Sequence, residues 1–273
     1  MIYKYNSKRI YKKMCSKCLK YDVISFDIFD TVLIRMLNPK ESVFDRVNLI
    51  AKRNGIVLDN FVQKRRQAQT FAASKGLLKL HDIYMCFEEL FGLKQEDCCK
   101  LEECELEAEN ELCVLNSTMS DLMNFLIEHD KKYIFISDMH LSNRQLSDLL
   151  RNKGVPIDDD RIVHVSCEYK ESISTGRLFY EVQKTYPNGT TILHIGDSLK
   201  SDYLRPKFIS GFQSVHVPRV EGDILSKMFF ANLSVNTDLA YKWGYSFVAP
   251  VLWLFCKWVE KNALQHSFDK ILF

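Results

Sequence analysis

The 273-residue chain contains few of the residues that are typical of non-globular proteins. Its 10 glycines and 6 prolines are too few for a collagen-like or linker-dominated chain. Its formal net charge is only +2, so no global electrostatic field favours nucleic acid as a partner. It does contain 47% hydrophobic and 12% aromatic residues, enough for a sizeable core. The length fits one large domain with an insertion, or two domains.

The sequence also lacks a secretory signal and a long apolar run. The N-terminal segment is basic and has no apolar stretch of the kind that a signal peptide needs. The longest apolar run, about 14 residues between Lys242 and Lys257, contains Pro250 and falls short of the ~20 residues that span a bilayer. It favours a core or interface helix, and we expect a soluble, cytoplasmic protein with no transmembrane segment.

The nine cysteines, an odd number, do not require a disulfide framework. Cys15 and Cys18 have a spacing found in zinc sites, but no second Cys-x-x-Cys or His pair accompanies them, and a closed zinc site needs four ligands. Without a secretory signal a reducing compartment is the default, so we expect free thiols. Four more cysteines lie in an acidic helical stretch without a His pair: Cys98, Cys99, Cys104 and Cys113.

Charge and periodicity set three segments apart from the rest of the chain. Residues 1–20 form a basic segment, with seven Lys or Arg and no acid between Lys4 and Lys20, which favours a solvated amphipathic helix. Residues 39–115 have a helical pattern and no convincing strand, so we expect an all-helical insertion that ends in an acidic helix. Residues 236–273 form a C-terminal helical segment that ends like the opening of a strand. We expect either a fragment or a protein that has lost a second half, with a domain missing after this segment.

Residues 21–38 and 116–235 have the pattern of an α/β core. A short β-branched and aromatic run, Tyr21–Asp27, predicts a buried strand. After residue 116 helices and strands alternate, beginning with a helix capped by Ser117 or Thr118. Strands separated by helices of about 10–15 residues pair in parallel through right-handed crossovers. The sequence therefore predicts a doubly wound, Rossmann-like parallel α/β sheet with a helical insertion.

Three of the predicted strands end in polar, acid-bearing turns. An Asp after an apolar strand is most often a turn residue or a helix cap, so each turn alone is a weak signal. In a parallel sheet, however, functional groups collect beyond the carboxyl ends of the strands. The three turns are Asp27–Thr31, Ser137–His140 and Gly196–Asp202.

These turns carry the motifs FDIFDT, FISDMHLS and HIGDSLKSD, in this order. With them the sequence resembles the haloacid dehalogenase-like (HAD) superfamily, which transfers phosphoryl groups through an aspartate nucleophile. The resemblance extends from about Tyr21 to Arg219, and residues 39–115 lie where that superfamily inserts a cap. More narrowly, the motifs are similar to those of HAD domains attached to bacterial surface-polysaccharide and glycosyltransferase proteins. This implies a small phosphorylated substrate such as a sugar phosphate, and a glycosyltransferase partner or a further domain.

The resemblance implies a role for each motif residue. Asp27 would be the nucleophile and would form an aspartyl-phosphate. Ser137 and Lys170 would complete the catalytic group, and Ser137 would also bind the phosphoryl group together with Thr31 and Asp138. The implied cofactor is Mg²⁺, which prefers oxygen ligands. Its ligands would be Asp27, the main-chain carbonyl of Phe29, Asp197 and Asp202.

Two positions depart from the superfamily's pattern. Its phosphatases usually have an Asp that protonates the leaving group where this chain has Phe29, and general acid catalysis is typically worth about 10²–10⁴-fold. Asp30 is the candidate acid/base in its place, provided that the turn is irregular, because adjacent strand residues face opposite ways. The superfamily's basic residue is expected shortly before Gly176, where Lys170 comes slightly early and Arg177 slightly late.

Three functions stay open. The first is a Mg²⁺-dependent phosphatase or phosphotransferase. The second is a haloacid dehalogenase, which also has an aromatic residue at the position of Phe29 but needs no metal, whereas Asp197 favours one. The third is a non-catalytic module that binds a phosphorylated ligand or orients a partner, and the missing acid and the displaced lysine both support it.

Three residues close to the motifs receive no catalytic role at this stage. His140 follows the second motif and is expected to act as a helix cap or loop residue at least as readily as a substrate contact. His194 lies on a predicted strand and is expected to be packed. Arg35 could reach a phosphate or the cap, and it is left unassigned.

Overall fold

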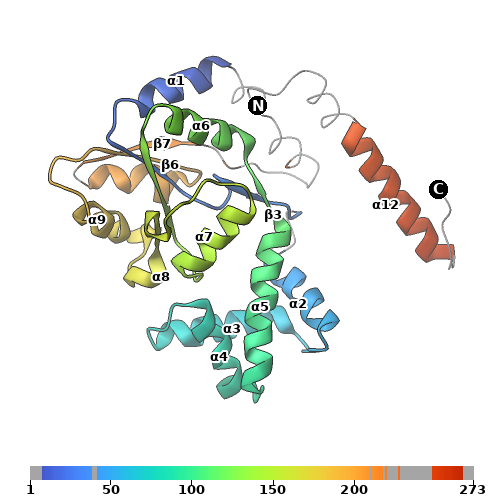
Figure 1. The fold of residues 1–273 in the computed structure, drawn as a ribbon. Helices are drawn as coiled ribbons and strands as arrows, with labels where there is room; N and C mark the ends of the chain where they lie inside the picture. Colours follow the sequence, from blue (N-terminus) through green and yellow to red (C-terminus); the bar gives the residue numbers. More distant parts are fainter. Residues whose placement is uncertain are drawn as a thin grey trace.

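A computed structural model describes residues 8–38, 42–209, 211–217, 219, 227 and 248–266 of the chain. At its centre is a five-stranded parallel sheet in the order β5-β4-β1-β6-β7, with helices on both faces (Figure 1). The predicted doubly wound α/β sheet with a helical insertion is confirmed. The strands are β1 (Val23–Phe26), β4 (Lys132–Ser137), β5 (Val163–Val165), β6 (Ile192–Gly196) and β7 (Phe212–His216).

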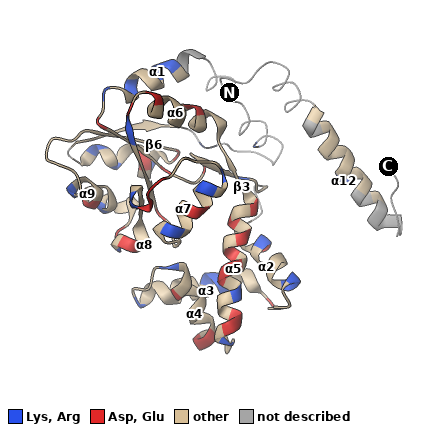
Figure 2. Cartoon of the chain, in the orientation of Figure 1, with Lys and Arg blue, Asp and Glu red and all other residues tan. Residues whose placement is uncertain are grey.

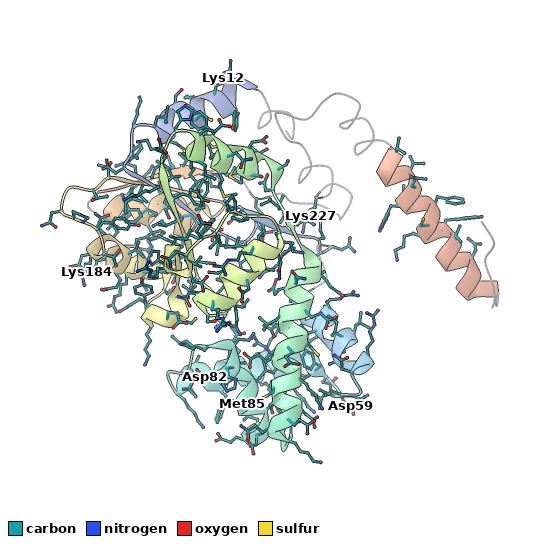
Figure 3. All side chains as sticks on the ribbon, viewed as in Figure 1. Lys12, Asp59, Asp82, Met85, Lys184 and Lys227 are labelled. Carbon is teal, nitrogen blue, oxygen red and sulfur yellow. The ribbon has the colours of Figure 1, made fainter. Side chains whose placement is uncertain are left out.

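Alternate residues along the strands enter two hydrophobic clusters, one on each face of the sheet. In β1, Ile24 and Phe26 enter one cluster and Val23 enters the other, as the two-residue period of a strand requires. Figure 3 shows side chains filling the space between sheet and helices, with Lys12 and Lys184 at the outer surface. The first face is covered by α1 (Lys8–Cys18), α6 (Ser117–Glu128) and α7 (Asn143–Asn152), and the second by α9 (Arg177–Lys184).

Strand β1 lies in the middle of the sheet and determines where a ligand can bind. From β1 the chain continues to β4 and β5 on one side, and it then returns to add β6 and β7 on the other side. The strand order therefore reverses at β1, and α/β sheets bind ligands beyond the carboxyl ends of the strands at such a switch point. The three acid-bearing turns follow β1, β4 and β6, so they meet at this edge.

The helical insertion lies between two short strands that are not part of the main sheet. Strands β2 (Leu33–Arg35) and β3 (Cys113–Leu115) pair antiparallel, with Leu33 opposite Leu115. We call the four helices between these strands the helical block. They are α2 (Val43–Arg53), α3 (Phe61–Ser74), α4 (Leu80–Phe91) and α5 (Gln95–Leu112).

Two local predictions are wrong. The expectation that residues 39–115 contain no strand fails at β3, because its pairing partner β2 is distant in sequence and leaves no local signal. The cap of α6 is Asn116, whose side chain accepts a hydrogen bond from the Thr118 N–H, and not Ser117 or Thr118. The Asn116 side chain also donates to the Thr31 carbonyl oxygen over 2.9 Å, so this cap holds the turn after β1 as well.

The remaining described elements are short, apart from one C-terminal helix. All nine cysteines lie in the described part and have free thiols. No helix among the described residues is long and apolar enough to cross a membrane, and residues 243–247 of the apolar C-terminal run lie outside them. The elements are α8 (Ser166–Tyr169), α12 (Ala249–His266), a π-helical turn (Leu199–Leu204) and three 3₁₀ turns (Asp160–Ile162, Ile173–Thr175 and Pro206–Phe208).

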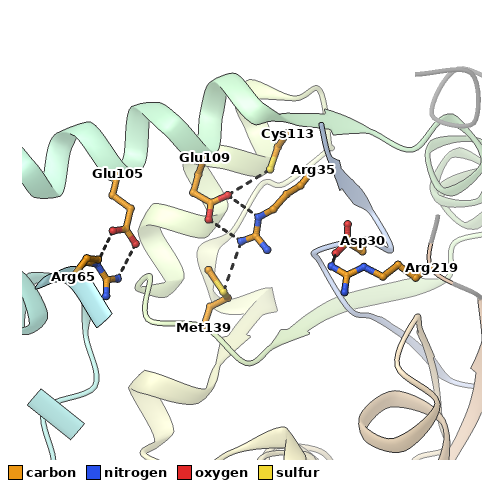
Figure 4. Close-up of polar contacts among 8 residues, drawn as sticks. All are labelled: Asp30, Arg35, Arg65, Glu105, Glu109, Cys113, Met139 and Arg219. Atoms are coloured by element: carbon orange, nitrogen blue, oxygen red, sulfur yellow. Dashed lines mark hydrogen bonds and ion pairs between the residues drawn. The ribbon is translucent and has the colours of Figure 1, made fainter. Parts of the chain in front are cut away.

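A buried group of charged and polar side chains holds the helical block together. Arg65 of α3 donates two hydrogen bonds of 2.8 Å to the Glu105 carboxylate of α5, and the Tyr84 hydroxyl donates a third over 2.5 Å. Arg65 and Glu105 are 1% and 4% exposed. Figure 2 shows acidic residues along α5, and Figure 4 shows that Glu105 is turned toward Arg65. Glu105 therefore forms an ion pair in the interior of the helical block, although the helix that carries it is acidic.

Glu105→Gln is expected to destabilise the protein by about 3–5 kcal/mol, because it leaves the buried Arg65 charge without its partner. The exposed pair Lys75–Glu89 is the matched control, and Glu89→Gln is expected to cost at most about 1 kcal/mol. Urea unfolding of the two variants measures the difference. Equal losses of stability would contradict an internal ion pair.

Candidate functional site

Three carboxylates converge at the carboxyl edge of the sheet. Asp27 follows β1, Asp197 follows β6, and Asp202 lies in the π-helical turn after β6. One oxygen atom from each lies within 4.8 Å of the other two. Asp27 and Asp202 are buried, and Asp197 is half-buried.

Gly196 makes this close approach possible. A Cβ atom added to Gly196 would lie 2.4 Å from Asp202 Cβ and 2.7 Å from its Oδ2. No real side chain tolerates such distances, so any larger residue here would push Asp202 away from the other two carboxylates. The Asp202 carboxylate is also held by a 2.8 Å hydrogen bond that it accepts from the Ser198 N–H.

Burial and neighbouring carboxylates raise the pKa of two of these acids, Asp27 and Asp197. Burial, followed by the charges of Asp202 and Asp197, raises the pKa of Asp27 well above its usual range. Burial and then Asp202 raise the pKa of Asp197 to about 6. Two acids that resist ionisation, next to a third carboxylate, form a site that favours a cation.

The donor set fits Mg²⁺, a hard ion that prefers oxygen ligands and is usually held by one or two carboxylates plus phosphate and water. Asp27, Asp197 and Asp202 are the residues that would hold it. Phe29, whose carbonyl is the fourth predicted ligand, lines the same cavity.

The carboxylates lie in a cavity of about 280 Å³. We call it the Asp27 cavity. It also contains hydroxyl groups and two guanidinium groups, which can bind the oxygens of an anionic ligand. Its lining residues other than the three carboxylates are Phe29, Asp30, Arg35, Ser137, Asp138, Met139, Ile173, Ser198, Ser201 and Arg219.

The turn after β1 orients Asp27. The Thr31 hydroxyl donates to Asp27 Oδ2 over 3.1 Å, and the Asp27 N–H donates to the Ile195 carbonyl of β6 over 2.9 Å. Thr31 is fully buried and does not line the Asp27 cavity. In this structure its hydroxyl is bonded to Asp27.

Asp30 has the irregular backbone that the sequence analysis required of an acid/base. Its φ of +60° lies in the left-handed region, which is uncommon for any residue except glycine. This conformation breaks the alternation of a strand and lets Asp30 line the Asp27 cavity together with Phe29. Asp30 accepts a hydrogen bond from Arg219 there (Figure 4).

Lys170 lines a different, neighbouring cavity of about 180 Å³. Asp138 and Met139 border both cavities. Asp138 accepts a 2.7 Å hydrogen bond from the Ser172 hydroxyl, which also belongs to the wall of the Lys170 cavity. The structure thus brings together the predicted residues Asp27, Phe29, Asp30, Ser137, Asp138, Asp197 and Asp202, but it does not bring Lys170 into the same cavity.

Two arginines in the Asp27 cavity had no role in the sequence analysis. The Arg35 guanidinium lies 3.8 Å from the centre of the Phe29 ring and donates to Glu109 of α5 over 2.9 and 2.7 Å. Arg219 pairs with Asp30. Arg35 follows the first motif closely, so its position was a weak signal. Arg219 comes after β7, and no feature of the sequence pointed to its place in the cavity.

His194 is buried behind Asp202. Its Nδ1 lies 2.8 Å from the Ser25 hydroxyl, and its Nε2 lies 3.6 Å from Asp202 Oδ1. Its ring also packs edge-on against Phe179. His140 is half-buried and bonds through Nδ1 to the Leu78 carbonyl at 3.0 Å, so it joins the second motif to the helical block.

Comparisons with known proteins give partial similarities. No family model matches the chain. The catalytic subunit of DNA polymerase epsilon from Candida glabrata is 28% identical over 145 residues, which are 51% of this chain. The chain spans only 6% of that protein's length.

Among solved structures, the chain is similar to hydrolases of the HAD superfamily. A 2-haloacid dehalogenase from Pseudomonas syringae has a TM-score of 0.49 and 10% identity, over 72% of this chain and 86% of that one. A HAD family enzyme from Bacteroides thetaiotaomicron, in complex with magnesium and inorganic phosphate, has a TM-score of 0.47 and 15% identity, over 74% of this chain and 96% of that one. A HAD hydrolase from Bacillus subtilis bound to magnesium has a TM-score of 0.41 and 18% identity, over 71% of this chain and 87% of that one.

Mg²⁺ is expected to raise the melting temperature more at pH 8 than at pH 5. In the metal-free protein a carboxyl whose folded pKa is raised holds its proton more tightly than in the unfolded chain. Stability contributed by Asp197 therefore falls as the pH rises from about 4 through about 6. Above that pH the carboxylate is ionised and free to bind metal.

Thermal unfolding in EDTA and in excess Mg²⁺, at both pH values, measures this effect. The control is Asp197→Asn, which removes the titrating ligand and is expected to reduce the Mg²⁺-dependent shift at pH 8. Equal stabilisation by Mg²⁺ at pH 5 and pH 8 would contradict a carboxylate site.

Proposed function

We propose that this chain is a Mg²⁺-dependent phosphatase or phosphotransferase of the HAD superfamily, acting on a small phosphorylated metabolite through an aspartyl-phosphate at Asp27. The observation that carries the proposal is the convergence of Asp27, Asp197 and Asp202 at the switch point of the sheet. Two further carboxylates beside the nucleophile would repel an anionic substrate unless a cation lies between the carboxylates and the substrate. Bound Mg²⁺ would supply that neutralisation.

Asp27 acts as the nucleophile. One of its carboxylate oxygens attacks phosphorus, the bond from phosphorus to the leaving group breaks, and an aspartyl-phosphate forms. The Thr31 hydroxyl fixes the rotation of this carboxylate through its bond to Oδ2. Water then attacks the aspartyl-phosphate and returns Asp27 as the free carboxylate.

Other side chains of the Asp27 cavity bind the phosphoryl oxygens. Ser137 is buried at the end of β4 and lines the cavity with Asp138. Arg35 and Arg219 bring positive charge to the same wall. These groups act as fixed hydrogen-bond donors and charges, which stabilise a transition state without having to reorganise.

The sequence resemblance alone suggests the biological setting. It favours a sugar phosphate or a related intermediate of cell-surface polysaccharide synthesis, with a glycosyltransferase partner. The neighbouring cavity, bordered by Lys170 and His140, offers room for the part of the substrate that is not transferred.

Hydrolysis of 4-nitrophenyl phosphate is expected to require both Mg²⁺ and Asp27. Asp27→Asn removes the nucleophile and should abolish turnover, whereas Asp148→Asn on the exposed face of α7 should leave it unchanged. Acid-quench trapping of phosphate on the wild-type protein tests the covalent intermediate. A folded protein that binds Mg²⁺ without turning over this substrate would instead be a non-catalytic module, and release of halide without Mg²⁺ would identify a dehalogenase.

The catalytic role predicted for Lys170 has its own test. Because Lys170 lines the neighbouring cavity, Lys170→Ala is expected to lower kcat on 4-nitrophenyl phosphate far less than the ~10²-fold that loss of a fixed electrostatic group costs. Lys184→Ala, on the surface of α9, is the matched control. A 10²-fold loss for Lys170→Ala alone would show that this side chain reaches the phosphoryl group.

A further inference from the structure

The Arg35 guanidinium is held in a fixed position at the wall of the Asp27 cavity. Glu109 accepts two parallel hydrogen bonds from it, 2.9 Å from Nε and 2.7 Å from Nη2. The Phe29 ring lies under its flat face at 3.8 Å, and Met139 Sδ contacts Nη2 at 4.0 Å. Because Glu109 is only 4% exposed and also accepts from the Cys113 thiol, its carboxylate is itself fixed. Arg35 is thus a preorganised charge.

Arg35 lies on the side of the cavity that faces the helical block. Its partner Glu109 belongs to α5 of that block (Figure 4), whereas Asp27 follows strand β1 of the sheet. In phosphoryl transfer the attacking and leaving oxygens lie roughly in line on opposite sides of phosphorus. A leaving group displaced by Asp27 therefore departs away from the sheet, toward the block and Arg35.

The described wall of the Asp27 cavity offers no side chain suited to protonate that leaving group. Three of its five carboxyl groups form the cation site, and no His, Lys or Tyr lines it. The fourth, Asp30, is engaged by Arg219. The fifth, Asp138, accepts a hydrogen bond from Ser172. Phe29 adds an aromatic ring that supports Arg35 and cannot donate a proton.

We propose that Arg35 receives the leaving group as an anion, and that the substrate is therefore a phosphoanhydride or an acyl phosphate. This inference rests on the function proposed above and narrows its substrate class. It excludes simple sugar monophosphates, because their alkoxide leaving groups need a proton. Phosphate and carboxylate ions are both stable without one, and both match the planar donors of a guanidinium.

The step balances without a proton donor. The bond from Asp27 oxygen to phosphorus forms, the bond from phosphorus to the bridging oxygen breaks, and the electron pair stays on that oxygen, which departs as an anion paired with Arg35. Water then attacks the aspartyl-phosphate. The bond between Asp27 and phosphorus breaks with its electron pair returning to the carboxylate, and the proton of the water passes to the phosphate product or to solvent.

The first experiment compares probes that differ in leaving group. With the Mg²⁺-loaded protein, kcat/KM is expected to be about 10²–10⁴-fold higher for acetyl phosphate or inorganic pyrophosphate than for glycerol phosphate, the range that a missing general acid leaves uncompensated. Phenyl phosphate should be a much poorer substrate than 4-nitrophenyl phosphate. Comparison of acetyl phosphate with pyrophosphate separates the acyl phosphates from the anhydrides. Equal rates for phenyl and 4-nitrophenyl phosphate would reveal a proton donor and overturn the inference.

The second experiment removes Arg35. Since Arg35→Met alone leaves Glu109 buried and unpaired, the double variant Arg35→Met with Glu109→Gln is made beside it. Both are expected to lower kcat/KM for acetyl phosphate and pyrophosphate by about 10²-fold, and to lower the preference for them over glycerol phosphate. The control, Arg46→Met with Glu111→Gln, removes an exposed ion pair between the same helix α5 and α2.

The readouts separate a charge role from a structural one. A residue that only ties α5 to β2 would lower the rates of all probes by one factor, and an unchanged preference in both Arg35 variants would overturn the inference. Turnover that survives Asp27→Asn would instead refute the proposed function. Turnover that needs Asp27 but favours glycerol phosphate would refute the inference alone.

Discussion

The structure depends on holding three carboxylates close together in a largely buried place. Burial and the charges of neighbouring carboxylates oppose the ionisation of two of them, as the raised pKa values of Asp27 and Asp197 show. The arrangement persists because the surrounding structure determines it: parallel pairing places Phe26 opposite Ile195, so the residues after β1 and β6 emerge side by side. The bare backbone of Gly196 then admits Asp202. Such locally unfavourable features concentrate at functional sites, where the rest of the fold compensates for them.

The wall of the Asp27 cavity also carries positive charges, opposite in sign to the three carboxylates. Arg35 and Arg219 both face the Asp27 cavity, and each is matched by one carboxylate, Glu109 and Asp30 respectively. This pairing keeps the guanidinium groups in place when no anion is bound. The cavity therefore contains one region suited to a cation and another suited to an anion, which is the electrostatic pattern that a phosphoryl group bound beside a metal ion requires.

The sequence was most informative where the decisive features are local. Strand ends can be recognised from short apolar runs, so the positions of Asp27, Ser137 and Asp197 at one edge of a parallel sheet could be predicted. Features that depend on contacts between distant segments could not. Strand β3 exists because β2 lies beside it, and Arg219 reaches the cavity from beyond β7. Lys170 was close enough in sequence to the expected basic position to suggest a shared site, yet its left-handed backbone, with φ of +55°, follows α8 at the border of the neighbouring cavity.

Helix α5 connects the interior of the helical block to the chemistry of the site. Glu105 and Glu109 are four residues apart, so they lie on one face of the helix, one turn from each other. Glu105 is bonded to Arg65 inside the block, and Glu109 to Arg35 at the cavity. A shift of α5 along its axis would therefore strain both ion pairs at once. Helix α5 thus couples the packing of the helical block to the position of the Arg35 guanidinium at the Asp27 cavity. A substitution that repacks the block would also move this positive charge.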